Sequence, residues 1–355
     1  MSEHKHKPVL GITIGDLNGI GPEIILKTFS DPRMLLFCTP VIYASTSTIN
    51  YHRKVIDAKN FNFHAVNSID QIHRGKVNLI NLWDETLRFT IGTPGPENGK
   101  YSFMSIKQAA LDANDGKLDG IVTAPIDKYT IQSDEFNFPG HTEYFAEVFN
   151  SKVLMLMLGE ELRIGVATGH VPISEVSSQL NKDKLREKLI LLGKSLMIDF
   201  GIETPKIAVL GLNPHAGEKG MLGKEELEII EPVIADLKSK GMYSFGPYPA
   251  DGFFGKRMYR EFDGVLAMYH DQGLSPFKLL NFETGVNYTA GLPVPRTSPD
   301  HGTAYDIAGK NIADETSFRY AVYKACDIVN KRKEYKEDNA NPLKSRSVKE
   351  KEEGA

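Results

Sequence analysis

The chain has 355 residues, of which 41% are hydrophobic and 25% are charged, and its formal net charge is −4. This is the composition of a globular protein with one large domain or two of ordinary size. The slightly acidic balance, without a basic stripe carrying interleaved aromatic residues, gives no reason to expect a nucleic acid as partner.

The N-terminal sequence MSEHKHKPVL lacks the apolar segment of a signal peptide. The longest apolar run, Val153 to Leu158, is far too short to cross a membrane. The two cysteines, Cys38 and Cys326, are too few for a disulfide scaffold and fit a reducing compartment. We therefore expect a cytoplasmic protein without membrane contact.

The first expected strand covers Pro8 to Ile14, and the turn GDLNGIGP leads from it into a helix that is apolar-periodic from Ile24. This order is the opening of a βα unit. The three glycines of the turn match neither the GxGxxG fingerprint of a Rossmann fold nor a P-loop. The turn is either a tight connection with Pro22 in the first helical position or a contact for an anion or cofactor.

Apolar runs and amphipathic segments alternate along the rest of the chain. The expected strands cover residues 40–44, 77–82, 120–124, 154–158, 163–170, 206–215, 265–269 and 285–290. The expected helices cover residues 101–114, 174–180, 182–200, 224–240 and 314–330, with turn-rich connections at 92–99 and 246–252. This alternation predicts an α/β fold with a mostly parallel sheet. Residues 331–355 are almost free of apolar side chains and are expected to form a charged, solvated tail.

Three of the expected strands lead to a histidine: RIGVATGH to His170, KIAVLGLNPH to His215 and GVLAMYH to His270. In open parallel sheets, ligands bind beyond the carboxyl ends of the strands. The spacing matches no short metal motif, and one such histidine alone is usually a hydrogen-bonded loop residue. The threefold recurrence favours a catalytic divalent metal held by three imidazoles, with Asp251 and Asp271 available beside them. Zn, Co, Ni or Fe would suit these ligands, and nearby carboxylates would also tolerate Mg or Mn.

Several residues are candidates for anion binding. Lys278 and Arg296 lie on either side of the expected strand 285–290, where surface solvation is the alternative role. Arginine binds a carboxylate or phosphate through a bidentate fork, whereas lysine acts as a point charge or proton carrier. His141 and Thr142 stand at an expected helix N-terminus and can meet an anion, unless Thr142 is only an N-cap. A metal beside these groups predicts a small, multiply charged substrate.

Seven blocks, in chain order, resemble the 4-hydroxythreonine-4-phosphate dehydrogenases of pyridoxal phosphate biosynthesis: TAPIDK, FPGHTE, ATGH, LGLNPHAGE, MYHDQG, GVN and RTSPDHGTA. The resemblance covers roughly residues 8–330. HGTAYDIAGK also resembles the cofactor loop of isopropylmalate and isocitrate dehydrogenases, a wider superfamily with the same fold. The resemblance implies an α/β/α two-domain subunit without a Rossmann domain, in a homodimer with its active site at the subunit interface. The first domain would comprise residues 1–130 and 290–330, and the second, residues 131–289, would carry the metal site and the dimer contacts.

The resemblance also implies roles for individual residues. The metal ligands would be His170, His215 and His270, shared between the two subunits. The substrate would contact His141, Thr142, Lys278, Asn287 and Arg296. The cofactor, NAD or NADP, would contact His301, Gly302, Thr303 and Asp306. Catalytic proton transfer would belong to Lys278, or to Asp271 through a water molecule. The implied reaction oxidises 4-phosphooxy-L-threonine with the help of Zn, Mg or Co, and loss of carbon dioxide then yields 3-amino-2-oxopropyl phosphate.

The chain departs from the family pattern at Leu17-Asn18, where many members carry Pro-Ala, and in residues 331–355, which exceed the usual family end. Three other functions remain open from the sequence. The substrate of a related dehydrogenase would be 4-phospho-D-threonate or 4-phospho-D-erythronate. A three-histidine metal hydrolase or lyase would work without nicotinamide. A non-catalytic protein would only bind a phosphorylated metabolite, which is less favoured because burying so many polar groups is costly.

Overall fold

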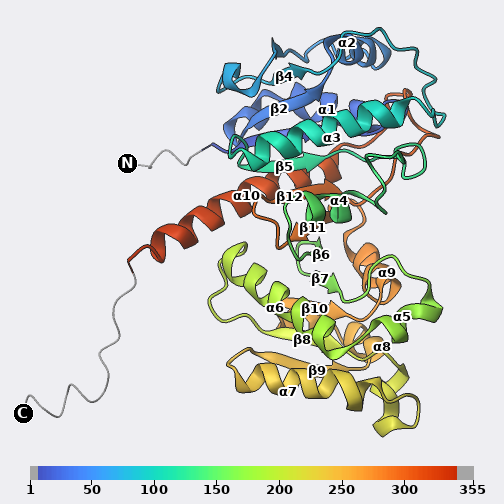
Figure 1. Cartoon of the computed structure of the whole chain (residues 1–355), viewed down its shortest axis with the longest axis vertical. Coiled ribbons are helices and arrows are strands. Elements are labelled where there is room, and N and C mark those ends of the chain that lie inside the picture. The colour runs from blue at the N-terminus through green and yellow to red at the C-terminus, as the bar shows by residue number, and fades with distance from the viewer. Residues whose placement is uncertain (1–6, 342–355) are drawn as a thin grey trace, which may run out of the picture.

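The computed structural model describes residues 7–341, and Figure 1 shows their arrangement. A single twelve-stranded sheet runs through these residues in the order β3-β4-β2-β1-β5-β12-β11-β6-β7-β10-β8-β9. The strands are β1 (Val9–Thr13), β2 (Thr39–Ala44), β3 (His64–Val66), β4 (Asn78–Asn81), β5 (Gly120–Thr123), β6 (Leu154–Leu158), β7 (Arg163–Val166), β8 (Ile207–Leu210), β9 (Ser244–Tyr248), β10 (Gly264–Ala267), β11 (Val286–Ala290) and β12 (Arg296–Pro299).

Helices connect these strands and cover the sheet (Figure 1). The α-helices are α1 (Gly21–Ser30), α2 (Thr46–Val55), α3 (Asn98–Asn114), α4 (His141–Val148), α5 (Val176–Gln179), α6 (Lys182–Ile198), α7 (Glu231–Ser239), α8 (Ala250–Gly255), α9 (His270–Asn281) and α10 (Thr316–Asp338). Short 3₁₀ segments are η1 (Pro32–Leu36), η2 (Ile69–Gln71), η3 (Ile173–Glu175), η4 (Pro214–Gly220) and η6 (Met258–Glu261), and η5 (Glu226–Ile230) is a π-helix.

The predicted α/β class with a mostly parallel sheet is confirmed. Among the described residues, the antiparallel pairs are β11 with β12, β11 with β6, and β6 with β7. Strands β1, β2, β5, β8 and β10 are buried at every position, as expected where helices cover both faces of a parallel sheet. Burial on both faces of the sheet explains why these strands appear in the sequence as continuous apolar runs. The division into two domains stays a prediction.

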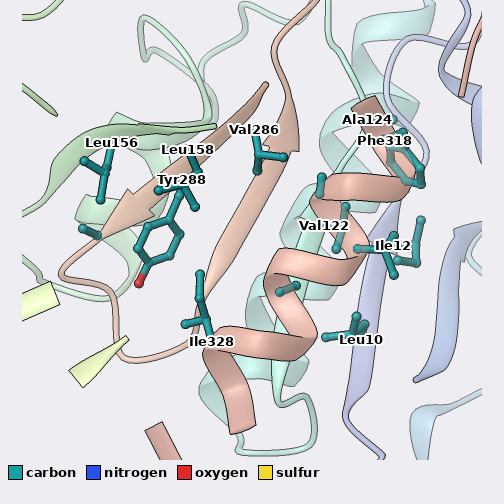
Figure 2. Packing of buried hydrophobic residues seen from close by; sticks show 14 of the residues in the cluster. Leu10, Ile12, Val122, Ala124, Leu156, Leu158, Val286, Tyr288, Phe318 and Ile328 are labelled. Carbon is teal, nitrogen blue, oxygen red and sulfur yellow. The ribbon is translucent and has the colours of Figure 1, made fainter. Parts of the chain in front are cut away.

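Helix α10 packs across the middle of the sheet. In Figure 2, its Phe318 lies near Ala124 at the end of β5, and its Ile328 lies on the side of Tyr288 from β11. All four side chains belong to one hydrophobic cluster, and all are less than a tenth exposed. The last helix of the described residues therefore packs against β5, β12 and β11, which are neighbours in the middle of the sheet.

Several segments differ from the sequence expectations. Helix α10 continues beyond its expected end at Asn330 to Asp338, so residues 331–338 belong to the folded chain, whereas residues 342–355 of the expected tail lie outside the described residues. The expected turn at 246–252 contains the end of β9 and the start of α8. Strand β12 was not predicted, because it ends on Pro299 and follows Pro293 and Pro295, and proline is rare inside a sheet.

The turn after β1 is a tight connection, with Pro22 in the first turn of α1. Asp16 Oδ1 accepts the backbone N–H of Asn18 at 2.9 Å. Asn18 in turn donates from Nδ2 to the Thr93 carbonyl at 2.9 Å and accepts the Thr90 N–H at 3.2 Å. The side-chain amide of Asn18, a residue at which the chain departs from the family pattern, thus connects this turn to residues 90–93.

The buried His52 on α2 predicts a pH dependence of stability. Burial lowers the pKa of His52 to about 4, and its Nε2 has no hydrogen-bond partner among the described residues. An unfolded histidine titrates near pH ~6.5, so below that pH the unfolded state binds more protons than the folded state. Acidification from pH ~6.5 to ~4 should therefore remove up to about 3 kcal/mol of stability through this one group.

We expect the His52→Leu variant to lose this part of the acid destabilisation. Urea unfolding at pH 7 and pH ~4 measures the free energy of unfolding of both proteins. The m-value serves as the control for unchanged compactness of the two states. If the original chain and the variant lose stability in parallel on acidification, His52 does not carry the effect.

Candidate active site

A pocket of about 260 Å³ lies where the strand ends of β5 and β12 meet the first turn of α4 and the last turn of α9. It is lined by all five expected substrate residues and by three other expected site residues. These are His141, Thr142, Lys278, Asn287 and Arg296, with His170, His301 and Gly302. The fold thus brings together residues from five separate segments of the sequence, while their individual roles stay predictions.

Arg296 is the buried cation of this pocket, with only 3% of its surface exposed. Its Nε and Nη2 donate to Thr123 Oγ1 at 3.1 and 2.5 Å, and its Nη1 donates to Thr289 Oγ1 at 3.3 Å. No carboxylate of the described residues forms an ion pair with it. Burial lowers the pKa of Arg296 to about 9, while Glu143 acts in the opposite direction. A buried guanidinium held only by hydroxyls is suited to bind an anionic ligand.

His141 begins helix α4 beside Arg296. Burial, with smaller contributions from Arg296 and Lys128, holds the pKa of His141 well below its usual range, so its imidazole is neutral. Its Nε2 is buried without a hydrogen-bond partner among the described residues, which a bound ligand would provide. Gly140 occupies the N-cap position and no side chain caps the helix, so the alternative that Thr142 is the N-cap is wrong.

Lys278 and Asp300 form an ion pair at the rim of the pocket. Lys278 Nζ lies 3.5 Å from Asp300 Oδ1, and the lysine is half-exposed whereas the aspartate is largely buried. Burial raises the pKa of Asp300, and Lys278 opposes that shift. Asp300 was not among the expected site residues, although it lies in the block RTSPDHGTA directly before His301. A carboxylate between a strand end and a candidate site histidine was the signal that could have identified it.

The expected cofactor loop lies only partly at the pocket. His301 and Gly302 line it, whereas Thr303 and Asp306 do not. Burial lowers the pKa of His301, and its Nε2 is buried without a partner among the described residues. The carbonyl of Thr303 instead accepts the N–H of Ile20 at 2.9 Å, which joins the loop to the start of α1.

Two of the three expected metal ligands are neighbours. The ring centroids of His170 and His270 are 5.5 Å apart. His270 Nδ1 lies 2.7 Å from Asp271 Oδ1, and His170 Nδ1 lies 4.0 Å from Glu143 Oε1. His270 is the first residue of α9, whose helical turns place Lys278 at the pocket.

The third expected ligand, His215, lies in the segment η4 after β8. The described part of the chain contains no group of three histidine, cysteine or acidic side chains arranged to hold a metal ion. A single chain therefore pairs His170 with His270 and does not add His215 to them. Asp271 has a side chain that is 82% exposed and does not line the pocket.

None of the helices in residues 7–341 is both long and apolar enough to span a membrane.

The family model described as "Pyridoxal phosphate biosynthetic protein PdxA" matches residues 36–325. The chain belongs to the PdxA family. It is 49% identical over 346 residues to the 4-hydroxythreonine-4-phosphate dehydrogenase of Bacteroides thetaiotaomicron, a match that covers 97% of this chain and 94% of that relative. The resemblance noted in the sequence is thereby confirmed, and this PdxA family member is a dehydrogenase.

Other PdxA relatives extend the comparison. The crystal structure of 4-hydroxythreonine-4-phosphate dehydrogenase from Klebsiella pneumoniae superposes with a TM-score of 0.79 at 31% identity, and covers 92% of this chain and 100% of that one. A relative from Oceanobacillus iheyensis, provisionally named a D-threonate 4-phosphate dehydrogenase, is 38% identical over 328 residues, covering 91% of this chain and 98% of the relative. The fold is therefore common to relatives named for two different substrates.

Proposed function

We propose that the chain oxidises the secondary hydroxyl of 4-phosphooxy-L-threonine with NAD or NADP, and that the product then loses carbon dioxide to give 3-amino-2-oxopropyl phosphate. The observation that supports this most is the buried Arg296, whose described hydrogen-bond partners are all neutral, in a pocket it shares with His141 and Lys278. A substrate with a phosphate and a carboxylate suits such a pocket. The 49% identity to a relative named for this reaction supports the same substrate.

The chain's own residues would bind and orient the substrate. Arg296 would bind one anionic group through its guanidinium, and the N-terminus of α4 would favour negative charge beside it. His141 would donate or accept one hydrogen bond through its unpartnered Nε2, and Asn287 has a buried Oδ1 likewise without a described partner. Lys278 would accept the proton that the substrate hydroxyl loses on oxidation, because Lys278 lines the pocket whereas Asp271 does not.

The nicotinamide cofactor would approach from the loop that begins at His301. His301 and Gly302 line the same pocket as the substrate residues, so a ring placed there would be next to the bound substrate. Thr303 and Asp306 would contact more distant parts of the cofactor.

The histidines fit a divalent metal. Two imidazoles whose ring centroids are 5.5 Å apart, with carboxylates beside both, suit Zn or Co, and Mg is also possible through the carboxylates. When bound, the metal would act as a Lewis acid on a substrate oxygen. His170 and His270 would hold it in one chain, and His215 would come from a second copy of the chain.

A homodimer would also cover exposed apolar side chains on or next to the segments that carry these histidines. Leu279 and Phe282 at the end of α9 are 86% and 78% exposed, Ile173 next to His170 is 77% exposed, and Met221 after η4 is 81% exposed. Exposed large apolar side chains of this kind are often covered by a partner. A second copy is the occupant that would also complete the set of three histidines.

Two alternative substrates, 4-phospho-D-threonate and 4-phospho-D-erythronate, stay open. Each has a hydroxyl where 4-phosphooxy-L-threonine has its amine, and each carries the same anionic groups. The relative named for D-threonate 4-phosphate favours keeping it. The hydrolase, lyase and binding-protein alternatives are set aside, because the chain belongs to a family of dehydrogenases.

The deciding experiment follows NADH formation with each of the three phosphorylated substrates, before and after treatment with a chelator. We expect turnover of 4-phosphooxy-L-threonine that the chelator abolishes and Zn, Co or Mg restores. Turnover of only the D-threonate or D-erythronate phosphate would overturn the proposed substrate. Activity that survives complete metal removal would overturn the proposed metal.

Replacing Lys278 by methionine tests its proposed role in proton transfer. We expect kcat to fall by about 10²–10⁴-fold, the usual contribution of general acid–base catalysis, while metal affinity stays nearly unchanged. Steady-state kinetics and a cobalt titration measure the two effects. Lys240→Met, at a surface lysine paired with Asp236, serves as the control that should change neither. Equal losses of kcat and metal affinity would argue against the role.

A further inference from the structure

The turn that carries His215 has an unusual backbone. Six successive residues of η4 have positive φ: His215 at 53°, Ala216 at 50°, Gly217 at 79°, Glu218 at 43°, Lys219 at 56° and Gly220 at 90°. Glycine adopts this left-handed region at no steric cost, but the other four residues do so only against Cβ clashes. Such a conformation persists only where the surrounding structure holds it, and it is concentrated at functional sites.

A buried carboxylate lies directly against this turn. Glu226 is 1% exposed, and its Oε1 accepts the backbone N–H groups of Leu212 and Asn213, both at 2.8 Å. Its Oε2 accepts Asn213 Nδ2 at 2.9 Å. A Cβ on Gly217 would lie only 2.5 Å from the same Oε2, so the carboxylate also packs against the middle of the turn.

Glu226 has no ion-pair partner among the described residues, so only N–H donors of the turn compensate its burial. It is the first residue of the π-helix η5, an unusual helix type that occurs frequently at functional sites. A second contact fixes the turn at its base: Gln272 Nε2 donates to the Gly211 carbonyl at 2.6 Å. Gln272 lies on α9, the helix that begins with His270, so the segment between β8 and the His215 turn contacts the His270 helix.

We propose that Glu226 is a positioning residue that holds the left-handed turn so that His215 is presented to the metal site completed by the second copy of the chain. The inference rests on the proposed role of His215 as a metal ligand. Glu226 itself does not touch the metal or the substrate. Its carboxylate compensates the N–H groups of Leu212 and Asn213, which fixes the direction in which the chain enters the strained turn.

The test compares four variants in the full-length protein. Glu226→Ala removes the carboxylate, and Glu226→Gln keeps its volume and one acceptor for the two N–H groups. Glu228→Ala is the matched control, because Glu228 is an exposed acid on the same helical segment. His215→Ala shows the effect of losing the proposed ligand itself.

Two readouts are measured on protein prepared without metal. Hydrogen exchange of the Leu212 and Asn213 amides reports on the turn and requires neither metal nor activity. A cobalt titration reports on the site. For Glu226→Ala we expect faster exchange at both amides and cobalt affinity about 10–100-fold lower, as for the loss of other groups that orient metal ligands. Glu226→Gln should lie between this variant and the original chain, and Glu228→Ala should match the original in both readouts.

The outcomes separate this inference from the proposed function. If His215→Ala loses cobalt affinity but Glu226→Ala does not, Glu226 is not a positioning residue and the proposed metal site stands. If His215→Ala binds cobalt as tightly as the original chain, the proposed role of His215 fails and this inference fails with it. If the Glu226→Ala variant does not fold, the Glu226→Gln variant provides the test. Amide exchange rates and cobalt affinity in that variant equal to those of the original chain would overturn the inference.

Discussion

Replacing Arg296 by methionine is expected to abolish most of the activity without weakening the fold. The guanidinium is buried, and its described partners are the hydroxyls of Thr123 and Thr289. Its desolvation is therefore uncompensated until an anion binds. Loss of a buried charge that binds an oppositely charged group costs about 2–5 kcal/mol, so kcat/KM should fall by about 30-fold or more. The free energy of unfolding should stay the same or rise, as often happens when a functional charged group that lacks an opposite charge is removed from a buried site.

Steady-state kinetics and urea unfolding of the Arg296→Met variant measure both effects. Arg260→Met is the control, because Arg260 forms an exposed ion pair with Glu161 at 2.7 Å. This control should leave the kinetics unchanged. A large loss of stability in Arg296→Met would show that Arg296 is primarily a structural residue, and unchanged kinetics would remove it from the proposed substrate site.

The second large effect is expected at Arg332, where alanine should destabilise the chain by about 3–5 kcal/mol. Arg332 donates from Nε to Asp199 Oδ1 at 2.7 Å and from Nη2 to the Tyr288 hydroxyl at 2.9 Å. Tyr288 in turn donates to Asp199 Oδ2 at 2.7 Å, and Ser195 donates to the same oxygen at 2.6 Å. Because Asp199 is 3% exposed, removal of the arginine leaves a buried carboxylate without its cation.

The neighbouring Lys331 is the matched control for this change. It forms a half-exposed ion pair with Glu334 at 2.6 Å, and such pairs contribute about 0–1 kcal/mol. Urea unfolding of Arg332→Ala and Lys331→Ala should therefore give clearly different free energies. Similar losses in both variants would mean that the network around Asp199 does not stabilise the fold.

The arrangement of the three candidate metal-ligand histidines was only partly predictable from the sequence. The strand that precedes each of His170, His215 and His270 was visible as an apolar run, and the structure pairs His170 with His270. The position of His215 depends on four left-handed non-glycine residues and on a carboxylate at position 226. No local propensity predicts such a turn, because its conformation is unfavourable in the isolated chain and contacts distant in sequence hold it.

The charged residues after Asn330 show a second limit. They were interpreted as solvated because they lack apolar neighbours, yet Arg332 reaches a buried aspartate and tyrosine from other elements. The local sequence does not distinguish a charged residue that is buried against a partner from one that is exposed to solvent. Asp300 was missed for the same reason, since its importance depends on the approach of Lys278 from α9.

The sequence by itself determined the α/β class and the strands that lead to the three histidines, because hydrophobic periodicity and turn chemistry are local properties of the chain. The set of polar residues that line one pocket followed from the resemblance to a known family. Tertiary structure alone decided that Arg296 is buried without an acidic partner, that Asp300 pairs with Lys278, and that His215 stands apart from the other two histidines. These features depend on which distant segments meet, and the free energy of burying a charge is set by the groups it meets there.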